Sequence, residues 1–436
     1  MERKKIAILG PGSIGKQTME VLGQKHMRKI YELVSVSGYG DKDIKSIEKA
    51  IAEFDIKKVS FAVLEVAEQF KQLYPEVEVL YGENHLEKII NETELDYSVI
   101  SVSGAVGIKA TIASLEKGLI TCIATKEVLV AAGPLVMELA KRMEKKFNKL
   151  QILRPIDSEH NAIWQALRAV ENKNGFNLEE VRRIIITASG GSLKNWSIED
   201  LHKATPDDVT KGHPTWSMGA KITVDSATMV NKALEVIEAH FLFGLPYEKI
   251  AILRHNQSIT HGIVETIDKF HIEQKASPDM RMPIQYALTY LDRFEFNLSE
   301  PMEYSEKAGE WKSLDYNKID YMDPERYPAF HIAMHFGMKG GLMPAIMNAA
   351  NEVIVNEGFL KGKIKFTEIP KLLLGVCSYF ETCFEWDIKE LTLKDILDVD
   401  QKVRKHTLDV LYCNNIIDYL DEDIKFAKEH QWGAKK

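Results

Sequence analysis

Short apolar runs alternate with amphipathic stretches through the first third of the chain. The first run, Lys5–Leu9, leads into a glycine-rich turn at 10–15, a helical pattern over 16–25 and a second run at 31–36. The same unit recurs, with apolar runs at 59–63, 77–80, 97–102 and 119–124, each followed by a helical pattern. Strands that alternate with helices form parallel sheets. The pattern therefore predicts a parallel sheet with helices on both faces over residues 1–150.

The pattern changes after Leu150, where helices and isolated strands no longer alternate. One more strand is expected at 149–156, and a helix opens at Asp157-Ser158. Further strands are expected at 184–187, 251–253, 258–266 and 270–275, an irregular segment at 202–222 and one long helix at 227–243. This mixture indicates an α+β domain over 151–294. A polar linker follows at 295–325, and apolar residues at helical spacing predict a helical domain over 326–436.

Composition and charge exclude several classes of protein. The chain has 436 residues, enough for about three domains of the usual size. Its formal net charge of −8 argues against a general nucleic-acid-binding protein. No apolar stretch reaches the roughly 18 residues that a membrane helix needs. The four cysteines form no CxxC pair, which disfavours a zinc knuckle and is typical of buried thiols in a reducing compartment. We therefore expect a cytoplasmic protein.

The segment Gly10-Pro11-Gly12-Ser13-Ile14-Gly15 has the spacing of a dinucleotide-binding turn. Gly10 permits the tight turn, Gly12 lets the backbone approach a pyrophosphate, and Gly15 allows the helix to pack closely. The motif is weak alone, but here it follows a predicted strand and precedes a predicted helix. We favour dinucleotide binding over an incidental turn.

Two acidic segments are candidates for a metal site. Asp157 and Glu159 stand two residues apart at the end of a strand and can converge on one hard cation, although a helix N-terminus favours the same residue types. Asn231, Lys232 and Glu235 share one face of the predicted helix at 227–243. They can add a carboxylate and grip a phosphate, although a solvated face with a Lys–Glu pair has the same spacing.

Two glycine-containing segments are candidates for substrate binding. Residues 211–220 carry His213, Trp216 and Met218 between glycines, which is typical of a lid that closes over a ligand rather than of a plain surface loop. Ser189 begins Ser-Gly-Gly after a predicted strand, where free amides suit a phosphate or an oxyanion, although an ordinary turn has the same sequence.

These segments, in this order, resemble the 1-deoxy-D-xylulose 5-phosphate reductoisomerase family. PIDSEHNAIWQAL at 155–167 is similar to the metal motif of that family, and HPTWSMGAKITVDSATMVNKALEVIEA at 213–239 to its lid and substrate helix. SPDMRMPI at 277–284 and MNAANE at 347–352 also match. The resemblance implies an N-terminal domain with a Rossmann-like parallel sheet, an α+β catalytic domain and a C-terminal helical bundle, assembled as a homodimer.

The resemblance also implies roles for individual residues. Asp157, Glu159 and Glu235 match metal ligands for Mg²⁺ or Mn²⁺, and Lys126 matches a lysine near the reacting carbon. Substrate contacts are implied for Ser158, Ser189, His213, Trp216, Ser226, Asn231 and Lys232. Cofactor contacts are implied for Gly10, Gly12, Ser13, Ile14, Gly15, Gly38, Tyr39, Thr125, Glu127, Met218 and Gly219.

The implied reaction is the NADPH-dependent conversion of 1-deoxy-D-xylulose 5-phosphate to 2-C-methyl-D-erythritol 4-phosphate, a step of isoprenoid precursor biosynthesis. The cofactor residues depart from the family pattern, because the turn is one residue shorter than the usual GSTGSIG. The segment after the second strand reads Gly38-Tyr39-Gly40-Asp41, without the cation that a 2′-phosphate prefers. Lys42 is close enough in sequence to compensate. The resemblance implies NADPH, which is expected because the match is so extensive, and NADH is the alternative. Alternative functions are a reductoisomerase for a related pentulose phosphate, a simple dehydrogenase and a non-catalytic paralogue.

Overall fold

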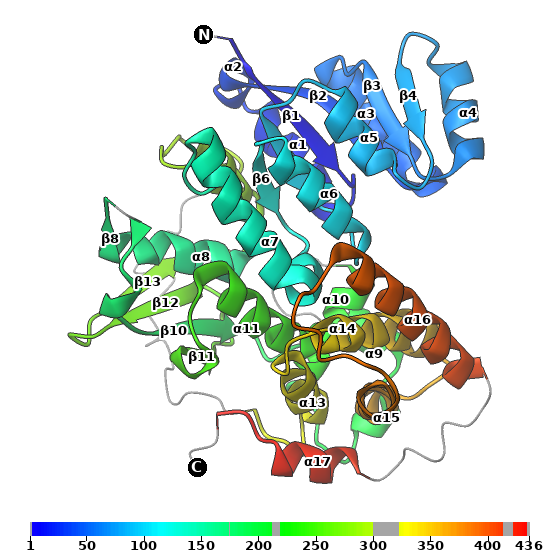
Figure 1. Cartoon of the computed structure of the whole chain (residues 1–436), viewed down its shortest axis with the longest axis vertical. Coiled ribbons are helices and arrows are strands. Elements are labelled where there is room, and N and C mark those ends of the chain that lie inside the picture. The colour runs from blue at the N-terminus through cyan, green and yellow to red at the C-terminus, as the bar shows by residue number, and fades with distance from the viewer. Residues whose placement is uncertain (1, 174, 212–218, 300–321, 413–421, 434–436) are drawn as a thin grey trace, which may run out of the picture. The chain divides into compact units, whose positions relative to one another are not determined.

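The chain forms two compact units in the computed structural model. The structure describes residues 2–173, 175–211, 219–299, 322–412 and 422–433. Unit 1 comprises Met1–Val128, Val136–Asn161 and Asp279–Pro301, and unit 2 comprises Leu129–Leu135, Ala162–Pro278 and Met302–Lys436. Among its passages between the units, the chain changes unit inside two helices, α7 (Lys126–Phe147) and α8 (Ser158–Leu167), and again between Pro278 and Asp279 (Figure 1).

Unit 1 is built on a seven-stranded sheet in the order β4-β3-β2-β1-β5-β6-β7, in which every pairing is parallel. Apolar side chains bury both faces of the central strands, as parallel sheets require. The strands are β1 (Lys4–Leu9), β2 (Tyr31–Gly38), β3 (Lys58–Phe61), β4 (Glu78–Tyr81), β5 (Tyr97–Ile100), β6 (Ile120–Ile123) and β7 (Leu153–Pro155).

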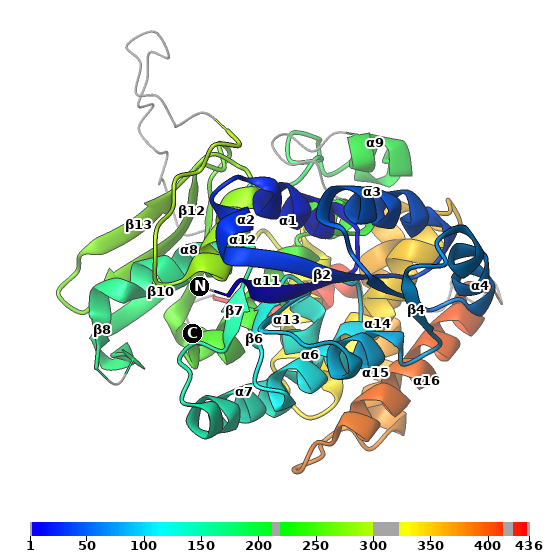
Figure 2. The ribbon, with the colours of Figure 1, turned by 90° about the horizontal axis from the view of Figure 1, so that it is seen from above.

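Helices cover both faces of this sheet, which confirms the predicted parallel α/β architecture. Figure 2 shows α1 and α3 on one side and α6 and α7 on the other. The helices of unit 1 besides α7 and the start of α8 are α1 (Ser13–Gly23), α2 (Met27–Ile30), η1 (Asp41–Asp43), α3 (Ile44–Phe54), α4 (Leu64–Leu73), α5 (His85–Glu92), α6 (Val106–Glu116) and α12 (Arg281–Thr289).

The strand order reverses at β1, which lies between β2 and β5. The loops after β1 and β5 therefore leave the same edge of the sheet in opposite directions. Ser101, which follows β5, donates a hydrogen bond from its hydroxyl to the carbonyl oxygen of Gly10 at 2.7 Å. Dinucleotides bind at such a switch point.

Unit 2 contains a four-stranded mixed sheet in the order β11-β10-β12-β13. β10 (Val181–Ala188) pairs in parallel with β11 (Ile250–Arg254) and antiparallel with β12 (Thr260–Thr266), which pairs antiparallel with β13 (His271–Lys275). A short hairpin joins β8 (Glu171–Asn172) and β9 (Gly175–Phe176). β13 is an edge strand, and Figure 1 shows the β12–β13 hairpin projecting from this sheet.

Helices make up the rest of unit 2, and the C-terminal part is helical as predicted. The helices that precede or join the strands are η2 (Arg168–Val170), η3 (Leu178–Glu180), η4 (Leu201–Lys203), α9 (Pro206–Lys211), α10 (Ala220–Thr228), α11 (Val230–Phe243) and η5 (Tyr247–Lys249). The C-terminal helices are α13 (Pro328–Gly337), α14 (Met343–Val353), the π-helix η6 (Ile354–Phe359), η7 (Phe366–Glu368), α15 (Ile369–Cys383), α16 (Leu393–Tyr412) and α17 (Asp423–Glu429).

The prediction of a single helix over 227–243 is wrong, because two helices, α10 and α11, share this segment. Met229 has a left-handed backbone (φ 61°) that ends α10 and starts α11. Residues 227 and 228 therefore belong to α10, whereas Asn231, Lys232 and Glu235 belong to α11. The segment 202–222 is also less irregular than predicted, because α9 and the start of α10 lie within it.

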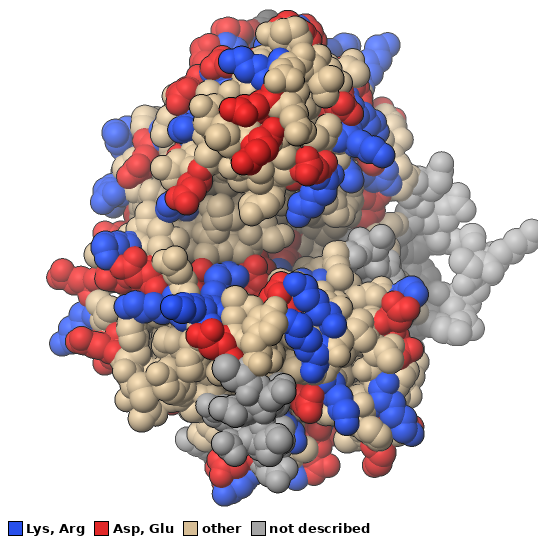
Figure 3. All heavy atoms as spheres, turned by 90° about the vertical axis from the view of Figure 1, so that its right-hand side faces the viewer, with Lys and Arg blue, Asp and Glu red and all other residues tan. Residues whose placement is uncertain are grey.

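Figure 3 shows acidic and basic side chains interspersed over the face that it draws. Among the residues that the structure describes, no helix combines the length and the apolar character that crossing a membrane requires.

Candidate active site

A tight glycine turn leads from β1 into α1. A Cβ atom at Gly10 (φ 99°) would lie 2.8 Å from the carbonyl oxygen of Ser101, and one at Gly15 would lie 2.2 Å from the carbonyl oxygen of Gly10. Gly12, which caps α1, faces open space, with no described atom beyond its chain neighbours within 4 Å of a Cβ position. The first turn of α1 carries no acidic residue. Its amides and dipole suit a pyrophosphate, so the turn fits a dinucleotide.

The end of β2 carries an exposed aromatic ring beside a lysine. Tyr39 is 64% exposed, and the ammonium of Lys42 lies 5.8 Å from the centre of its ring. The carboxylate of Asp43 accepts a hydrogen bond from the Tyr39 N–H at 2.6 Å. A Cβ atom at Gly38 would lie 2.9 Å from the Asp43 Cβ, so this corner is tightly packed. Asp41, which follows Gly40, is exposed at the start of η1.

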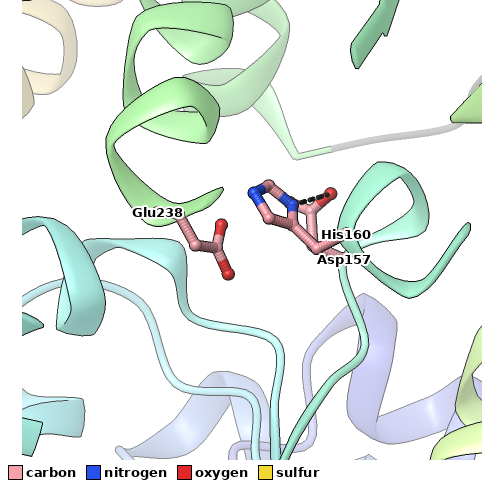
Figure 4. Close-up of side chains that lie close together, drawn as sticks. All are labelled: Asp157, His160 and Glu238. Carbon is pink, nitrogen blue, oxygen red and sulfur yellow. Dashed lines mark ion pairs between the residues drawn. The ribbon is translucent and has the colours of Figure 1, made fainter. Parts of the chain in front are cut away.

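Lys126, Asp157 and His160 form a buried charged cluster in unit 1. The Lys126 Nζ lies 2.7 Å from Asp157 Oδ2. The His160 Nδ1 lies 3.4 Å from Asp157 Oδ1, as the dashed line in Figure 4 marks. The side chains of Lys126, Asp157 and His160 are 6%, 10% and 0% exposed. Ser158 donates a hydrogen bond to the carboxylate of Glu159 in the first turn of α8. We call these five residues the Asp157 group.

The charge of Asp157 is secured by its neighbours. Burial alone would raise the pKa of this carboxyl, because burial disfavours the charged form. The ammonium of Lys126 and the ring of His160 outweigh burial and hold the pKa of Asp157 well below its ordinary value. A metal ligand must be deprotonated, and Asp157 and Glu159 offer the hard oxygens that Mg²⁺ and Mn²⁺ prefer. The Asp157 group therefore fits such a cation.

Thr125 and Glu127 flank Lys126 at the start of α7. The hydroxyl of buried Thr125 donates a hydrogen bond to the carbonyl oxygen of Val102, in the loop after β5. Glu127 is half-buried in the first turn of the helix. Thr125 thus ties the start of α7 to a neighbouring loop and fixes the backbone that carries Lys126.

A second cluster of predicted residues gathers at the C-terminal end of β10 in unit 2. The Lys232 Nζ donates a hydrogen bond to the carbonyl oxygen of Thr187 at 2.7 Å and lies 2.6 Å from Glu235 Oε2. The amide of Asn231 donates a hydrogen bond to the other carboxylate oxygen of Glu235. Half-buried Ser189 lies two residues beyond Thr187. We call Ser189, Ser226, Asn231, Lys232 and Glu235 the Lys232 group.

The Lys–Glu pair predicted from helical spacing is present, but it is buried rather than solvated. The side chains of Lys232 and Glu235 are 7% and 2% exposed. A carboxylate oxygen has two lone pairs, so each oxygen of Glu235 retains acceptor capacity beside its present partner. Glu235 therefore suits a metal ligand as well as an ion-pair partner.

Gly191 fixes the spacing between the loop after β10 and α10. A Cβ atom at Gly191 (φ 75°) would lie 2.6 Å from the carbonyl oxygen of Ser226 and 2.7 Å from the Ala227 Cα. The loop that carries Ser189 thus packs directly on the backbone that carries Ser226. Only glycine permits this approach.

The variant Gly191→Ala is expected to raise the KM for the phosphorylated substrate about tenfold, which corresponds to about 1.4 kcal/mol of binding. The added methyl group pushes the Ser226 backbone away from the loop after β10. Steady-state kinetics with Gly175→Ala as the control measures this effect, because Gly175 also has a positive φ (102°) but has open space around its Cβ position. Equal KM values for the two variants would contradict the positioning role of Gly191.

Three predicted residues, His213, Trp216 and Met218, lie outside the described residues, as do positions 300–321 of the predicted linker. Gly219, for which the resemblance implies a cofactor contact, is exposed and caps α10.

The sequence interpretation missed His160 and Asp225. His160 follows Asp157 by three residues on α8, a spacing that places the two side chains on one face. Asp225 precedes Ser226 and is 1% exposed. A charged residue inside an apolar helical pattern is the signal that identifies it.

Family comparisons cover most of the chain. Three family models match it: "1-deoxy-D-xylulose 5-phosphate reductoisomerase" over residues 6–133, "1-deoxy-D-xylulose 5-phosphate reductoisomerase C-terminal domain" over 153–243 and "DXP reductoisomerase C-terminal domain" over 276–406. The 1-deoxy-D-xylulose 5-phosphate reductoisomerase of Lysinibacillus sphaericus is 40% identical over 94% of this chain and 100% of its own length. That of Bacillus cereus is 40% identical over 93% of this chain and 99% of its own.

Solved structures agree with these matches. The reductoisomerase from Zymomonas mobilis in complex with NADPH has a TM-score of 0.79 at 32% identity, over 94% of this chain and 100% of that chain. A DOX-P reductoisomerase in complex with NADPH, fosmidomycin and magnesium has a TM-score of 0.80 at 30% identity, over 98% of this chain and 99% of that chain.

Proposed function

The chain belongs to the 1-deoxy-D-xylulose 5-phosphate reductoisomerase family, and we propose that the Asp157 group and the Lys232 group are two parts of its active site. The protein is an NADPH-dependent reductoisomerase that converts 1-deoxy-D-xylulose 5-phosphate to 2-C-methyl-D-erythritol 4-phosphate and uses a divalent cation. The observation that supports these site assignments most directly is the buried, ionised carboxylate of Asp157 at the start of α8.

Three carboxylates are proposed as the metal ligands, those of Asp157, Glu159 and Glu235. When bound, the divalent cation supplies Lewis acidity and NADPH supplies a hydride. Lys126 keeps Asp157 ionised and holds a positive charge where oxygen atoms of the substrate gain negative charge. Asn231 and Lys232 hold the Glu235 carboxylate in one orientation.

The phosphate of the substrate is proposed to bind the other members of the Lys232 group. Hydroxyl, amide and ammonium donors of Ser189, Ser226, Asn231 and Lys232 together match the acceptor oxygens of a phosphate. Ser158 is proposed to contact the substrate beside the metal. The lid over 211–220, with His213 and Trp216, is proposed to exclude water from the closed site.

The dinucleotide is proposed to lie across the switch point of the parallel sheet in unit 1. Gly12 offers open space for the pyrophosphate beside the first turn of α1. The remaining proposed contacts are Gly10, Ser13, Ile14, Gly15, Gly38, Tyr39, Thr125, Glu127, Met218 and Gly219.

An activity assay tests the proposed site. NADPH oxidation should require both 1-deoxy-D-xylulose 5-phosphate and Mn²⁺ or Mg²⁺, and product identification should give 2-C-methyl-D-erythritol 4-phosphate. Fosmidomycin should compete with the substrate. Turnover of the substrate without inhibition by fosmidomycin would contradict the proposed arrangement of Ser189, Asn231 and Lys232.

Cofactor preference is expected to depend on the charges at the end of β2. The 2′-phosphate of NADPH favours a nearby cation, and the ammonium of Lys42 lies beside the exposed Tyr39 ring. Lys42→Ser should lower the ratio of kcat/KM for NADPH to kcat/KM for NADH about tenfold, and Asp41→Ser should raise it.

The control for this prediction is Lys45→Ser, which removes another exposed lysine three residues further along the chain. Steady-state kinetics with both cofactors should give a ratio for this variant close to that of the unmodified enzyme. If Lys42→Ser and Lys45→Ser change the ratio equally, the preference depends on the net positive charge of this region and not on Lys42 specifically. An unchanged ratio in Asp41→Ser would exclude any part of Asp41 in the selection.

The enzyme is also proposed to form a homodimer through the edge of the mixed sheet in unit 2. β13 is an edge strand, and Ile267 and Phe270 in the hairpin before it are 60% and 69% exposed. An edge strand flanked by exposed apolar side chains is a site for pairing with another chain. These features favour β13 over β11, the other edge.

The variant Phe270→Glu is therefore expected to shift the solution mass toward that of one chain, 49.5 kDa. The charge cannot be buried against a second copy without a large desolvation cost. Light scattering coupled to size exclusion measures the mass. Leu150→Glu is the control, because Leu150 is 77% exposed in unit 1. A mass unchanged by Phe270→Glu would exclude this edge as the interface.

Domain roles and location are proposed on the same basis. Residues 1–150 are proposed to bind the dinucleotide, 151–294 to carry the metal and substrate site, 295–325 to link, and 326–436 to form the helical domain. The cytoplasm is proposed as the location, since Cys122, Cys377 and Cys383 are free thiols, as in a reducing compartment.

A further inference from the structure

Asp225 is a buried carboxylate that belongs to neither group of the proposed site. It lies on α10 and is 1% exposed. The Lys221 ammonium, one helical turn earlier, lies 2.6 Å from its Oδ2. The side-chain amide of Asn351, on α14, donates a hydrogen bond to its Oδ1 at 2.9 Å. Asp225 thus joins α10 to a helix 126 positions further along the chain.

The helix that carries Asn351, α14, is tied to a second C-terminal helix at the next residue. Asn351 is 0% exposed, and its neighbour Glu352 forms an ion pair with Arg404 of α16 at 2.6 Å. Arg404 also contacts Asp400 at 2.7 Å, one turn earlier on α16. The backbone that carries the Asn351 amide is therefore anchored to α16.

A buried polar contact of this kind is a poor source of stability. Removing a charge and an amide from water costs about as much as their interaction returns, so apolar residues of similar size would serve stability equally well. Unlike an apolar contact, the hydrogen bond between Asn351 and Asp225 depends on the direction from donor to acceptor. Apolar helix faces tolerate small shifts, whereas a hydrogen bond at 2.9 Å between Asn351 and Asp225 allows only one register.

We infer that Asn351 is a positioning residue, which fixes α10 through Asp225 and thereby places Ser226 for the phosphate of the substrate. Ser226 directly follows Asp225 on α10, and the same stretch of backbone packs against Gly191. This inference rests on the proposed phosphate-binding role of Ser226. It gives a specific task to the MNAANE motif at 347–352, which supplies no residue to the Asp157 or Lys232 group.

The motif provides its own control. Asn348 lies on the same helix, three residues before Asn351, and is 1% exposed. Within the described ranges, neither polar atom of its side chain has a hydrogen-bond partner. Asn348→Leu and Asn351→Leu therefore make the same chemical change in the same helix, but only the second breaks the contact with α10.

The test compares the kinetics of the full-length variants. Asn351→Leu should raise the KM for 1-deoxy-D-xylulose 5-phosphate about tenfold, with kcat and the KM for NADPH changed less than about twofold. Asn348→Leu should leave all three constants near those of the unmodified enzyme. Equal KM values in the two variants would overturn the inference.

A double variant separates positioning from a general loss of structure. Asp225→Asn combined with Asn351→Asp exchanges the amide and the carboxylate and restores a hydrogen bond between α10 and α14. Asn351→Asp alone should raise the KM for the substrate, because two carboxylates then repel each other. The double variant should bring this KM most of the way back to that of the unmodified enzyme. The exchange also provides a test if Asn351→Leu does not fold, and absence of recovery would overturn the inference.

Ser226→Ala distinguishes failure of this inference from failure of the proposed site. An unchanged substrate KM in Ser226→Ala would remove the proposed phosphate contact and the inference with it. A raised KM in Ser226→Ala beside an unchanged KM in Asn351→Leu would overturn the inference alone. Raised KM values in both, with Asn348→Leu unaffected, would support it.

Discussion

Glu235→Gln is expected to lower kcat about 10³-fold or more while leaving NADPH binding intact. The substitution keeps the shape of the side chain and removes the negative charge that a divalent cation requires of its ligands. Asp157→Asn should have a similar effect for the same reason. The dinucleotide turn at Gly10–Gly15 belongs to unit 1, so a change on α11 in unit 2 does not alter it.

Three measurements check this prediction. The rate of NADPH oxidation gives kcat, and calorimetric titration with Mn²⁺ gives the affinity for the metal. Quenching of protein fluorescence by NADPH shows whether the cofactor still binds. Enzyme treated with EDTA should lose activity in parallel with the variants and recover it when Mn²⁺ or Mg²⁺ is added. Activity that survives EDTA would contradict the assignment of a metal to these carboxylates.

The matched control is Glu238→Gln. Glu238 lies one turn further along α11 and is as deeply buried as Glu235, at 1% exposed for each residue. The Glu238→Gln variant removes an equivalent charge from the same helix, so its kcat shows how much activity is lost when any buried carboxylate of this helix is removed. If Glu238→Gln rather than Glu235→Gln abolishes Mn²⁺ binding, the assignment of Glu235 as a ligand is wrong.

Much of the fold can be predicted from local sequence, because strands that are buried on both faces of a parallel sheet are continuously apolar. The runs around Ile8 and Val36 are apolar throughout, and each lies between a turn and a helix. The boundary between α10 and α11 at Met229 has no comparable sequence signal. A methionine adopts a left-handed backbone only where tertiary packing imposes it, and no glycine or proline announces the position.

In the candidate site, too, contacts between residues close in sequence can be predicted, whereas contacts between distant segments cannot. The contacts of Asp157 with His160 and of Lys232 with Glu235 span three residues each. Helical spacing predicted the second pair, and it carries the same signal for the first, which the sequence interpretation missed. The contact between Asn351 and Asp225 joins segments far apart in the chain, and no local pattern specifies it.

The end of β2 illustrates a third case. The sequence shows Asp41 directly after the Gly38–Gly40 segment, but it does not show that the carboxylate two residues further along, that of Asp43, accepts the hydrogen bond of the Tyr39 backbone. A difference of two residues depends on where η1 begins, and short 3-10 turns leave only a weak trace in sequence.

Lys232→Met is expected to lower kcat/KM for 1-deoxy-D-xylulose 5-phosphate by about 10²-fold to 10³-fold. The methionine keeps most of the unbranched apolar stem but removes an ammonium with two contacts, to the Thr187 carbonyl oxygen and to Glu235. The phosphate loses a cationic partner, and the buried Glu235 carboxylate loses its counter-charge. Breaking a buried pair by removing one member costs about 3–5 kcal/mol, so the unfolding midpoint in urea should fall as well.

Lys249→Met separates the loss of the phosphate contact from the loss of stability. The Lys249 ammonium donates a hydrogen bond to the carbonyl oxygen of Val181 at 2.7 Å, at the start of β10, whereas Lys232 contacts Thr187 near the end of the same strand. Both variants therefore remove a lysine that binds a β10 carbonyl, but only Lys232 lies in the proposed site. Fosmidomycin affinity should fall in Lys232→Met and stay unchanged in Lys249→Met. If both variants bind fosmidomycin as tightly as the unmodified enzyme, Lys232 does not contact the phosphate, and its role is limited to holding Glu235.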